Sequence, residues 1–273
     1  MKILILYFSA TGNTANIAKI IEEKFTEAGA EVNIINITSN TDRERRIDFQ
    51  PYQAVVLGTP IYSSRAPRPV REWLRTLDGH GKKCAMFFTY GGFGVHPTHF
   101  STRQILREQN FIVVSSAEFL GAHTFNLGGW RAMRGRPDLS DYDLAGEYAV
   151  RMYKRFSGED AGIMGVLPES EYTDEQLDQR AERRFNIVTK IPTRDGEECR
   201  LCMRCEQLCP TGAMNAEKGQ AEAGKCIACF ACVANCPDHA LKVNDLSESW
   251  LPMLEMIKTD EDELKRQKSK IYL

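Results

Sequence analysis

The 273-residue sequence lacks several features that mark particular classes of protein. It has no run of about 18 apolar residues, so no membrane-spanning helix is predicted. The formal net charge of -2 indicates neither a basic surface for nucleic acid nor a strongly anionic surface. The apolar start at residues 3–8 is not followed by the small-residue cleavage site of a secretory signal. The length allows one or two domains.

Cysteine, in contrast, is abundant and regularly spaced. Eight of the nine cysteines form two runs of C-x₂-C-x₂-C-x₃-C, each followed by proline, at Cys199, Cys202, Cys205, Cys209, Cys226, Cys229, Cys232 and Cys236. This spacing is typical of the ligands of [4Fe–4S] clusters in bacterial ferredoxins. Zinc is the alternative metal, because Cys₄ zinc sites also use C-x₂-C pairs. Two tandem runs with Cys-Pro endings favour the clusters, and the sequence therefore predicts a function in moving single electrons.

The other cysteine, Cys84, falls within an apolar stretch and is predicted to be a small buried hydrophobic residue. The sequence therefore uses its cysteines for a metal framework rather than for disulfides. That usage indicates a reducing compartment, and we expect a cytoplasmic protein.

The beginning of the chain reads as a strand, a turn and a helix. Residues 2–8 form a continuous apolar run, and helical spacing of apolar residues follows from Ile17 to Phe25. The turn between them is rich in hydroxyl groups and opens a helix, which suits an anion such as a terminal phosphate. It matches neither G-x-x-x-x-G-K-[ST] nor G-x-G-x-x-G, so a dinucleotide is disfavoured. A helix N-cap without a ligand is the alternative.

Strands and helices continue to alternate after this unit. Further strands are predicted at 31–37, 54–58, 83–89 and 111–117, with helices between them. Such alternation predicts an α/β fold with a doubly wound parallel sheet. Ligands of these sheets bind beyond the carboxyl ends of the strands, where this sequence places small, hydroxyl-bearing and aromatic residues.

The turn at 9–14 resembles the [ST]-x-T-G-x-T loop of the flavodoxin family, and residues 1–158 as a whole are similar to that family. The resemblance implies a five-stranded sheet of order 2-1-3-4-5 and an FMN cofactor. It further implies that the loops after strands three and four flank the flavin ring, with Tyr62 and Tyr90 as stacking candidates. The cofactor-binding residues implied are Ser9, Ala10, Thr11, Gly12, Asn13, Thr14, Thr59, Pro60, Ile61, Tyr62, Ser63, Thr89, Tyr90, Gly91, Gly92, Phe93 and Gly94.

Residues 193–246 resemble a bacterial two-cluster ferredoxin, a small α+β domain with an internal duplication. The family pairing implies one cluster on Cys199, Cys202, Cys205 and Cys236, and a second on Cys209, Cys226, Cys229 and Cys232. A domain of this size has only a small hydrophobic core, and we therefore expect the clusters themselves to stabilise its fold. Residues 159–192 then form a linker with a charged, solvated helix at 174–186, and 247–273 a tail that could dock on either domain.

Two features after the fifth strand are left open. His123 could contact the flavin or a substrate, although a structural role is the simpler interpretation. Residues 128–137 form a basic loop with an exposed-looking Trp130, which is a surface excursion, a docking patch or a contact with the chain's own cluster domain.

The whole chain is similar to a flavodoxin–ferredoxin fusion. That resemblance implies electron transfer between FMN and two [4Fe–4S] clusters for soluble redox protein partners in anaerobic-type metabolism. The alternative is an FMN-dependent reductase of a small molecule such as a quinone or nitro compound. A cavity over the flavin, lined by His123 and Trp130, would favour the reductase, whereas an exposed flavin edge would favour the carrier. No catalytic acid, base or nucleophile is predicted, and a homodimer is possible through the linker.

Overall fold

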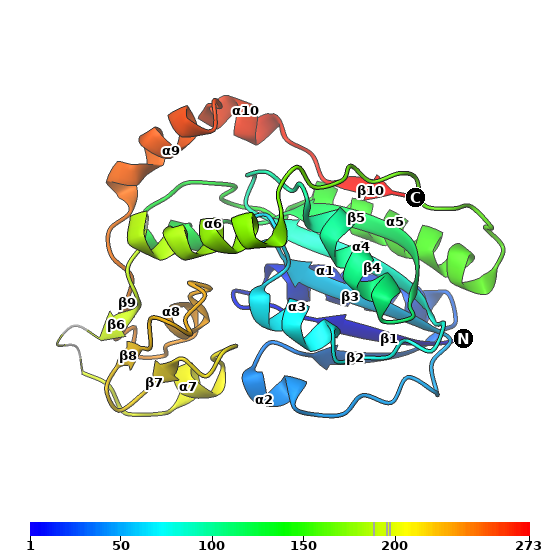
Figure 1. Ribbon diagram of the computed structural model, residues 1–273, viewed down its shortest axis with the longest axis horizontal. Coiled ribbons are helices and arrows are strands. Elements are labelled where there is room, and N and C mark those ends of the chain that lie inside the picture. The colour runs from blue at the N-terminus through cyan, green and yellow to red at the C-terminus, as the bar shows by residue number, and fades with distance from the viewer. Residues whose placement is uncertain (188, 195, 197) are drawn as a thin grey trace.

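A parallel sheet lies at the centre of residues 1–158 (Figure 1). The structure is a computed structural model that describes residues 1–187, 189–194, 196 and 198–273, with the side chains of 183–187 set aside. The parallel strands are β1 (Lys2–Tyr7), β2 (Glu31–Asn36), β3 (Ala54–Pro60), β4 (Lys83–Tyr90) and β5 (Ile112–Leu120). Their order is β2-β1-β3-β4-β5, which confirms the predicted flavodoxin-like order.

Helices cover both faces of this sheet, because successive side chains of a strand point to opposite faces. Ile3 and Ile5 of β1 pack with helices α1 (Asn13–Glu27) and α5 (Leu139–Ser157). Leu4 and Leu6 pack on the other face, with α3 (Arg68–Leu74) and α4 (Thr98–Glu108). The short helix α2 (Asn40–Arg43) follows β2. Each central strand is therefore buried on both faces, as its continuous apolar sequence predicts.

The sheet has a sixth strand that the sequence analysis did not predict. Residues Lys270–Tyr272 form β10, which pairs antiparallel with β5 and places Ile271 opposite Ala117. The hydroxyl of Tyr272 donates to Glu118 Oε2 at 2.9 Å, and the same oxygen lies 3.0 Å from Nε2 of the buried His99. The predicted five-stranded sheet is therefore incomplete, because the end of 247–273 covers the edge that β5 would otherwise expose.

Residues 193–246 fold as a small α+β unit, as predicted. Its four-stranded sheet has the order β7-β8-β6-β9, with antiparallel neighbours. The strands are β6 (Thr193–Arg194), β7 (Met214–Asn215), β8 (Gln220–Ala221) and β9 (Leu241–Lys242). Helices α7 (Arg204–Gln207) and α8 (Ala231–Ala234) each lie within one cysteine run, so the internal duplication of the sequence is also structural. We call this unit the cluster module.

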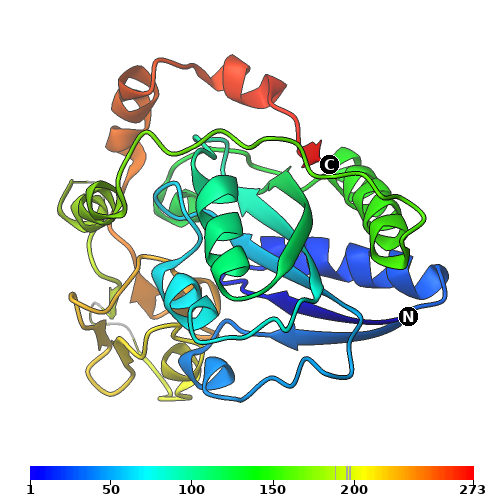
Figure 2. The same ribbon diagram turned by 45° about the vertical axis from the view of Figure 1, so that its right-hand side comes forward.

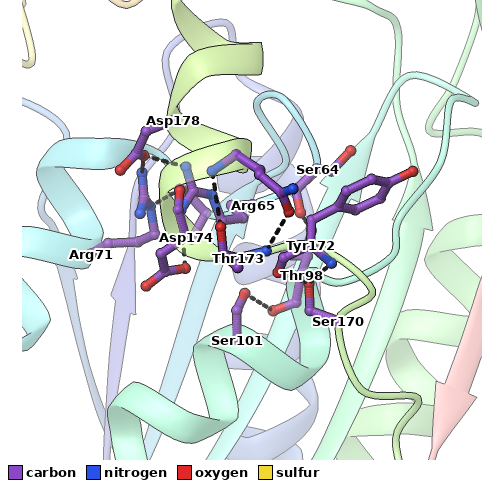
Figure 3. A network of polar contacts seen from close by, with 12 residues as sticks. Ser64, Arg65, Arg71, Thr98, Ser101, Ser170, Tyr172, Thr173, Asp174 and Asp178 are labelled. Carbon is purple, nitrogen blue, oxygen red and sulfur yellow. Dashed lines mark hydrogen bonds and ion pairs between the residues drawn. The ribbon is translucent and has the colours of Figure 1, made fainter.

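The charged helix α6 (Asp174–Ile187) is docked on the first domain rather than solvated (Figure 3). Asp178 pairs with the buried Arg65 and lies 3.2 Å from Arg71, and Asp174 lies 3.2 Å from Arg65. Leu177 of the same helix is 1% exposed. The expectation of a solvated spacer is therefore wrong for this face of the helix. The side chains of residues 183–186 of the predicted segment are not among those that the structure describes.

Residues 247–273 arch from the cluster module to β5 (Figures 1 and 2). After the short turn η2 (Ser247–Ser249), the segment forms α9 (Trp250–Met256), α10 (Glu261–Arg266) and then β10. Just before this segment, the N–H of Leu246 donates to Gly128 O, at the end of the turn η1 (Thr124–Gly128), at 2.6 Å. We call 247–273 the strap. Throughout the described part of the chain, every helix is too short or too polar to span a bilayer.

Replacing Asp178 with asparagine should loosen α6. Burial raises the pKa of this carboxyl, but the hydrogen bond and charge of Arg65, with those of Arg71, outweigh burial and hold the pKa below its ordinary value. This contribution is therefore present above the unfolded-state pKa and is lost as the pH falls through the folded-state pKa. We expect a loss of about 1 kcal/mol in the free energy of unfolding at neutral pH, because the carboxyl is half-exposed.

Urea unfolding at neutral and acid pH measures this loss. Glu175→Gln, at an exposed position of the same helix, is the matched control and should leave the free energy of unfolding almost unchanged. Equal stability of D178N and the wild type at neutral pH would show that the ion pairs do not hold the helix.

Candidate functional site

The turn between β1 and α1 has the geometry of an anion site. Gly12 lies at the start of α1 with φ +100°, a backbone conformation that favours glycine. The Ser9 hydroxyl accepts a hydrogen bond from the Ala15 N–H at 3.1 Å, which fixes the turn against the helix. The N–H groups of Asn13 and Thr14 belong to the same first turn, where the positive helix end favours a phosphate.

A second contact joins this turn to the end of β4. The hydroxyls of Thr14 and Thr89 lie 2.7 Å apart, and both residues are buried. The Asn13 side chain donates to Ala122 O at 2.9 Å, which ties the turn to the loop after β5 as well. Three loops that are far apart in the sequence therefore meet at the carboxyl edge of the sheet.

These loops border one cavity, which we call the first cavity. Of the residues predicted to bind flavin, it is lined by Ser9, Ala10, Thr11, Asn13, Thr14, Pro60, Ile61, Tyr62, Thr89, Tyr90 and Gly91. The loop after β5 contributes Gly121, Ala122, His123 and Thr124. Of these four, the sequence analysis proposed only His123 as a contact of the flavin, because the loop after β5 carries no recognisable motif.

The remaining predicted residues lie elsewhere. Thr59 is fully buried in β3, where its hydroxyl donates to Pro60 O at 3.2 Å, and Gly12 shapes the turn. Ser63, Gly92, Phe93 and Gly94 border a larger adjoining cavity of about 770 Å³. Tyr90, Gly91 and His123 line both cavities, so the two meet at the end of β4.

The larger cavity lies between the first domain and the strap, and we call it the covered cavity. Met253 and Ile257 of the strap line it opposite Phe93 and Trp130. Trp130 is 2% exposed and its indole N–H donates to Ser249 Oγ at 2.8 Å. The prediction of an exposed Trp130 is therefore wrong, because the residue packs against the chain's own strap.

His123 stands within an aromatic cluster at the boundary of the two cavities. Its ring centroid is 5.3 Å from that of Phe93, 5.1 Å from Trp130 and 5.0 Å from Phe125. Nδ1 accepts the N–H of Phe125 at 3.1 Å, so the neutral ring carries its proton on Nε2. A Cβ atom at Gly91 would lie 2.3 Å from this imidazole, so glycine at 91 makes room for His123.

The first cysteine quartet surrounds a cavity in the cluster module. Cys199, Cys202, Cys205 and Cys236 all line it, together with small and apolar residues. Burial raises the pKa of the Cys205 thiol, and charges on Cys236 and Cys199 raise it further. The structure thus brings together the four cysteines that the ferredoxin resemblance pairs. We call them the outer quartet, because Cys202 is exposed.

The second set comprises Cys209, Cys226, Cys229 and Cys232, which we call the inner quartet. Burial raises the pKa of the Cys232 thiol, and charges on Cys229, Cys226 and Cys209 raise it further. Cys229 and Cys232 are buried and the other two are half-buried. These four are likewise the set implied by the resemblance, although their role as ligands stays a prediction.

The donor chemistry of both quartets suits iron–sulfur clusters. Thiolates are the usual cluster ligands, and here they are packed among small apolar residues such as Ala213, Ala240 and Leu241. Within the described residues, no three His, Cys, Asp or Glu side chains are grouped as they would be around a single metal ion. Cys84 lies apart from both quartets: it is fully buried in β4, and burial raises the pKa of its thiol to about 12, as its predicted inert role requires.

Several contacts join the cluster module to the loops around the first cavity. Cys229 and Ala231 belong to the same apolar cluster as Ala10 of the phosphate turn, and Tyr62 packs against that cluster. The Asn235 side chain donates to Ala10 O at 3.3 Å. The rings of Phe125 and Phe230 are 5.5 Å apart, and Cys209 O accepts the Asn40 N–H at 3.3 Å. The cluster module is therefore seated on the loops that border the first cavity.

Comparison with known proteins agrees with both halves of this arrangement. A family model for a flavodoxin domain matches residues 4–110, and a model for a 4Fe-4S dicluster domain matches residues 191–237. A flavodoxin of Clostridium saccharobutylicum is 36% identical over 74 residues, which are 27% of this chain and 44% of that protein. A flavodoxin of Clostridium beijerinckii is 33% identical over 88 residues, or 32% of this chain and 63% of that protein.

A diflavin flavoprotein of Nostoc sp. (strain PCC 7120) is 30% identical over 97 residues, and the match spans only 17% of that protein. Among solved structures, oxidised Flavodoxin 2 from Bacillus cereus aligns with a TM-score of 0.45 and 21% identity, covering 59% of this chain and all of that one. The matched domains imply a flavin cofactor and iron–sulfur clusters. The chain is a fusion of a flavodoxin domain with a 4Fe-4S dicluster domain.

Replacing Thr11 with phenylalanine should reduce flavin binding without loss of iron. Thr11 lines the first cavity, so the larger ring would occupy space beside the phosphate turn. We expect the flavin content per chain of the purified protein to fall at least about tenfold, corresponding to about 1.4 kcal/mol. Thr26→Phe, at an exposed position near the other end of α1, is the control. If T11F retained its full flavin content, the turn that contains Thr11 would not be part of the flavin site.

Proposed function

We propose that this chain transfers electrons between FMN, bound at the first cavity with its ring reaching into the adjoining covered cavity, and two [4Fe–4S] clusters on the two quartets. It would thereby interconvert two-electron and one-electron carriers for soluble redox partners. The observation that carries the proposal is the hydrogen bond, 3.3 Å long, that the Asn235 side chain of the cluster module donates to Ala10 O in the turn between β1 and α1. That contact lies within one chain, so it supports transfer inside the molecule.

The residues around the first cavity suit FMN. The first turn of α1, with the Ser9–Thr14 loop, would hold the phosphate through N–H groups and hydroxyls. The loops that carry Tyr62 and Tyr90 would flank the ring system. FMN accepts electrons in pairs and releases them singly, whereas each cluster carries one. The chain's part is to hold these groups close together and out of water.

The two quartets would have different tasks. The inner quartet includes Cys226, which lines one cavity together with Tyr62 and Ser63 of the loop after β3, so its cluster would be the direct neighbour of FMN. The outer quartet includes the exposed Cys202, beside Leu201, which is 48% exposed. A protein partner could approach this end of the module, whereas the strap covers the cavity on the ring side. We therefore infer an order of partner, outer cluster, inner cluster and flavin.

A second candidate function is reduction of a small molecule at the flavin. The covered cavity favours it: about 770 Å³ lies within the range of pockets that enclose small ligands, and His123 and Trp130 line it. The sequence analysis named a cavity lined by these two residues as the feature that would favour a reductase over a carrier. On this proposal, protein partners supply electrons at the module and the small molecule receives them under the strap.

Cofactor analysis tests the composition. Acid-labile sulfide and iron should each come to about eight per chain, as two four-iron clusters require. The flavin released by denaturation should be FMN. Two zinc atoms per chain in place of iron would refute the cluster assignment, and recovery of FAD would refute the phosphate-turn assignment.

The order of the clusters predicts different effects of two cysteine variants. Under anaerobic conditions, sub-stoichiometric reductant is mixed with the holoprotein and the redistribution of electrons to the flavin is followed optically. C202S, in the outer quartet, should keep the fast, concentration-independent redistribution, whereas C229S, in the inner quartet, should lose it. Each variant must retain about four iron atoms to be compared. The opposite pattern would reverse the proposed order.

A further inference from the structure

We propose that the covered cavity binds a flat aromatic molecule that carries a negatively charged oxygen, such as an aromatic acid or an acidic quinone. The inference rests on the reductase candidate and names the class of its substrate. It is argued from the walls, the roof and the charges of this cavity.

The walls suit a flat apolar body. Phe93 and Trp130 lie with their ring centroids 5.6 Å apart in an edge-to-face arrangement, and both line the cavity. Met253 of α9 lines the cavity as well. Aromatic rings and thioethers both make favourable contacts with aromatic ligands, and methionine adapts to the shape of its neighbour.

Specific hydrogen bonds and an ion pair hold the strap in place over the covered cavity. Gln267 donates to Gly92 O at 2.8 Å, so the strap is bonded directly to the loop after β4. The indole N–H of Trp250 donates to Glu261 Oε1 at 2.6 Å, and the same carboxylate pairs with Arg131 at 2.7 Å. The cavity is therefore a built feature of the fold.

The charges at the cavity favour an anion. Arg180 and Lys258 line it, and Glu263 is the only carboxylate among its described lining residues. Glu263 accepts a hydrogen bond from the Thr259 hydroxyl at 2.9 Å. The guanidinium of Arg180 lies 4.7 Å from the centroid of the Tyr172 ring, which holds the cation at the edge of the site.

Two acidic residues of α6, the helix that carries Arg180, are already engaged. Asp174 and Asp178 pair with Arg65 and Arg71, as Figure 3 shows, and these pairs also set the position of the helix. Two basic side chains, Arg180 and Lys258, face one carboxylate at the cavity, so an anionic oxygen on the ligand is favoured over a cationic group. Because Nδ1 of His123 accepts the Phe125 N–H, its Nε2–H is a hydrogen-bond donor of the lining.

The test measures binding to the oxidised holoprotein, without reductant, by calorimetry and by the shift of the flavin absorption band. Lawsone, a naphthoquinone that is an anion at neutral pH, is compared with the neutral menadione. The wild type should bind lawsone more tightly. R180Q should weaken lawsone about tenfold, as loss of a charged hydrogen bond does, and change menadione less than about twofold. R107Q, an exposed arginine on α4 outside the cavity, is the matched control.

A second pair of variants locates the site. M253W fills the covered cavity and should abolish binding of both probes, whereas L251W, on the exposed side of the same helix, should leave it intact. Unchanged binding by M253W, tighter binding of menadione than of lawsone, or no binding of either probe would overturn the inference. Because no electron is transferred in this test, its failure is distinct from a failure of redistribution between clusters and flavin, which would overturn the proposed function instead.

Discussion

Burial of the segment Ala228–Ala231 against the first domain is the contact on which the rest of the arrangement depends. A unit of about fifty residues buries too little surface to be stable alone. Phe230 is 1% exposed and packs with Phe125, so its burial contributes about 1.5–3 kcal/mol that the module's own sheet does not supply. Because the segment carries Cys229, the same burial that stabilises the module sets the inner quartet beside the phosphate turn.

The strap solves two structural problems with one segment. Its last strand, β10, pairs with β5 and removes an exposed sheet edge, with Tyr272 bonded to Glu118 in place of water. Between the module and that strand, α9 and α10 must cross the carboxyl edge of the sheet, where ligands of doubly wound sheets bind. Because the strap is anchored at both ends, it has to pass over the covered cavity.

Local patterns in the sequence predict most of this protein. The cysteine spacing, the strand-turn-helix at the start and the alternation of strands and helices each depend on neighbours in the chain. The strap's strand was missed because Lys270–Tyr272 is short and follows a charged run, and only β5, 150 residues away, gives it a partner. The burial of Trp130 depends on Ser249 and Trp250, and the docking of α6 on Arg65. Such long-range pairs leave no periodic signal in one sequence.

The position of the strap favours the second of the two proposed functions, reduction of a small molecule at the flavin. A carrier that exchanges electrons with protein partners at its flavin edge needs that edge uncovered, yet Gln267 bonds the strap to Gly92 there. Opening it for each protein partner would break this bond and expose Trp130 and Leu264. A small molecule in the covered cavity needs no such opening. Cys202 of the outer quartet is exposed instead. We therefore expect protein partners to bind near the outer quartet and small molecules to bind at the covered cavity.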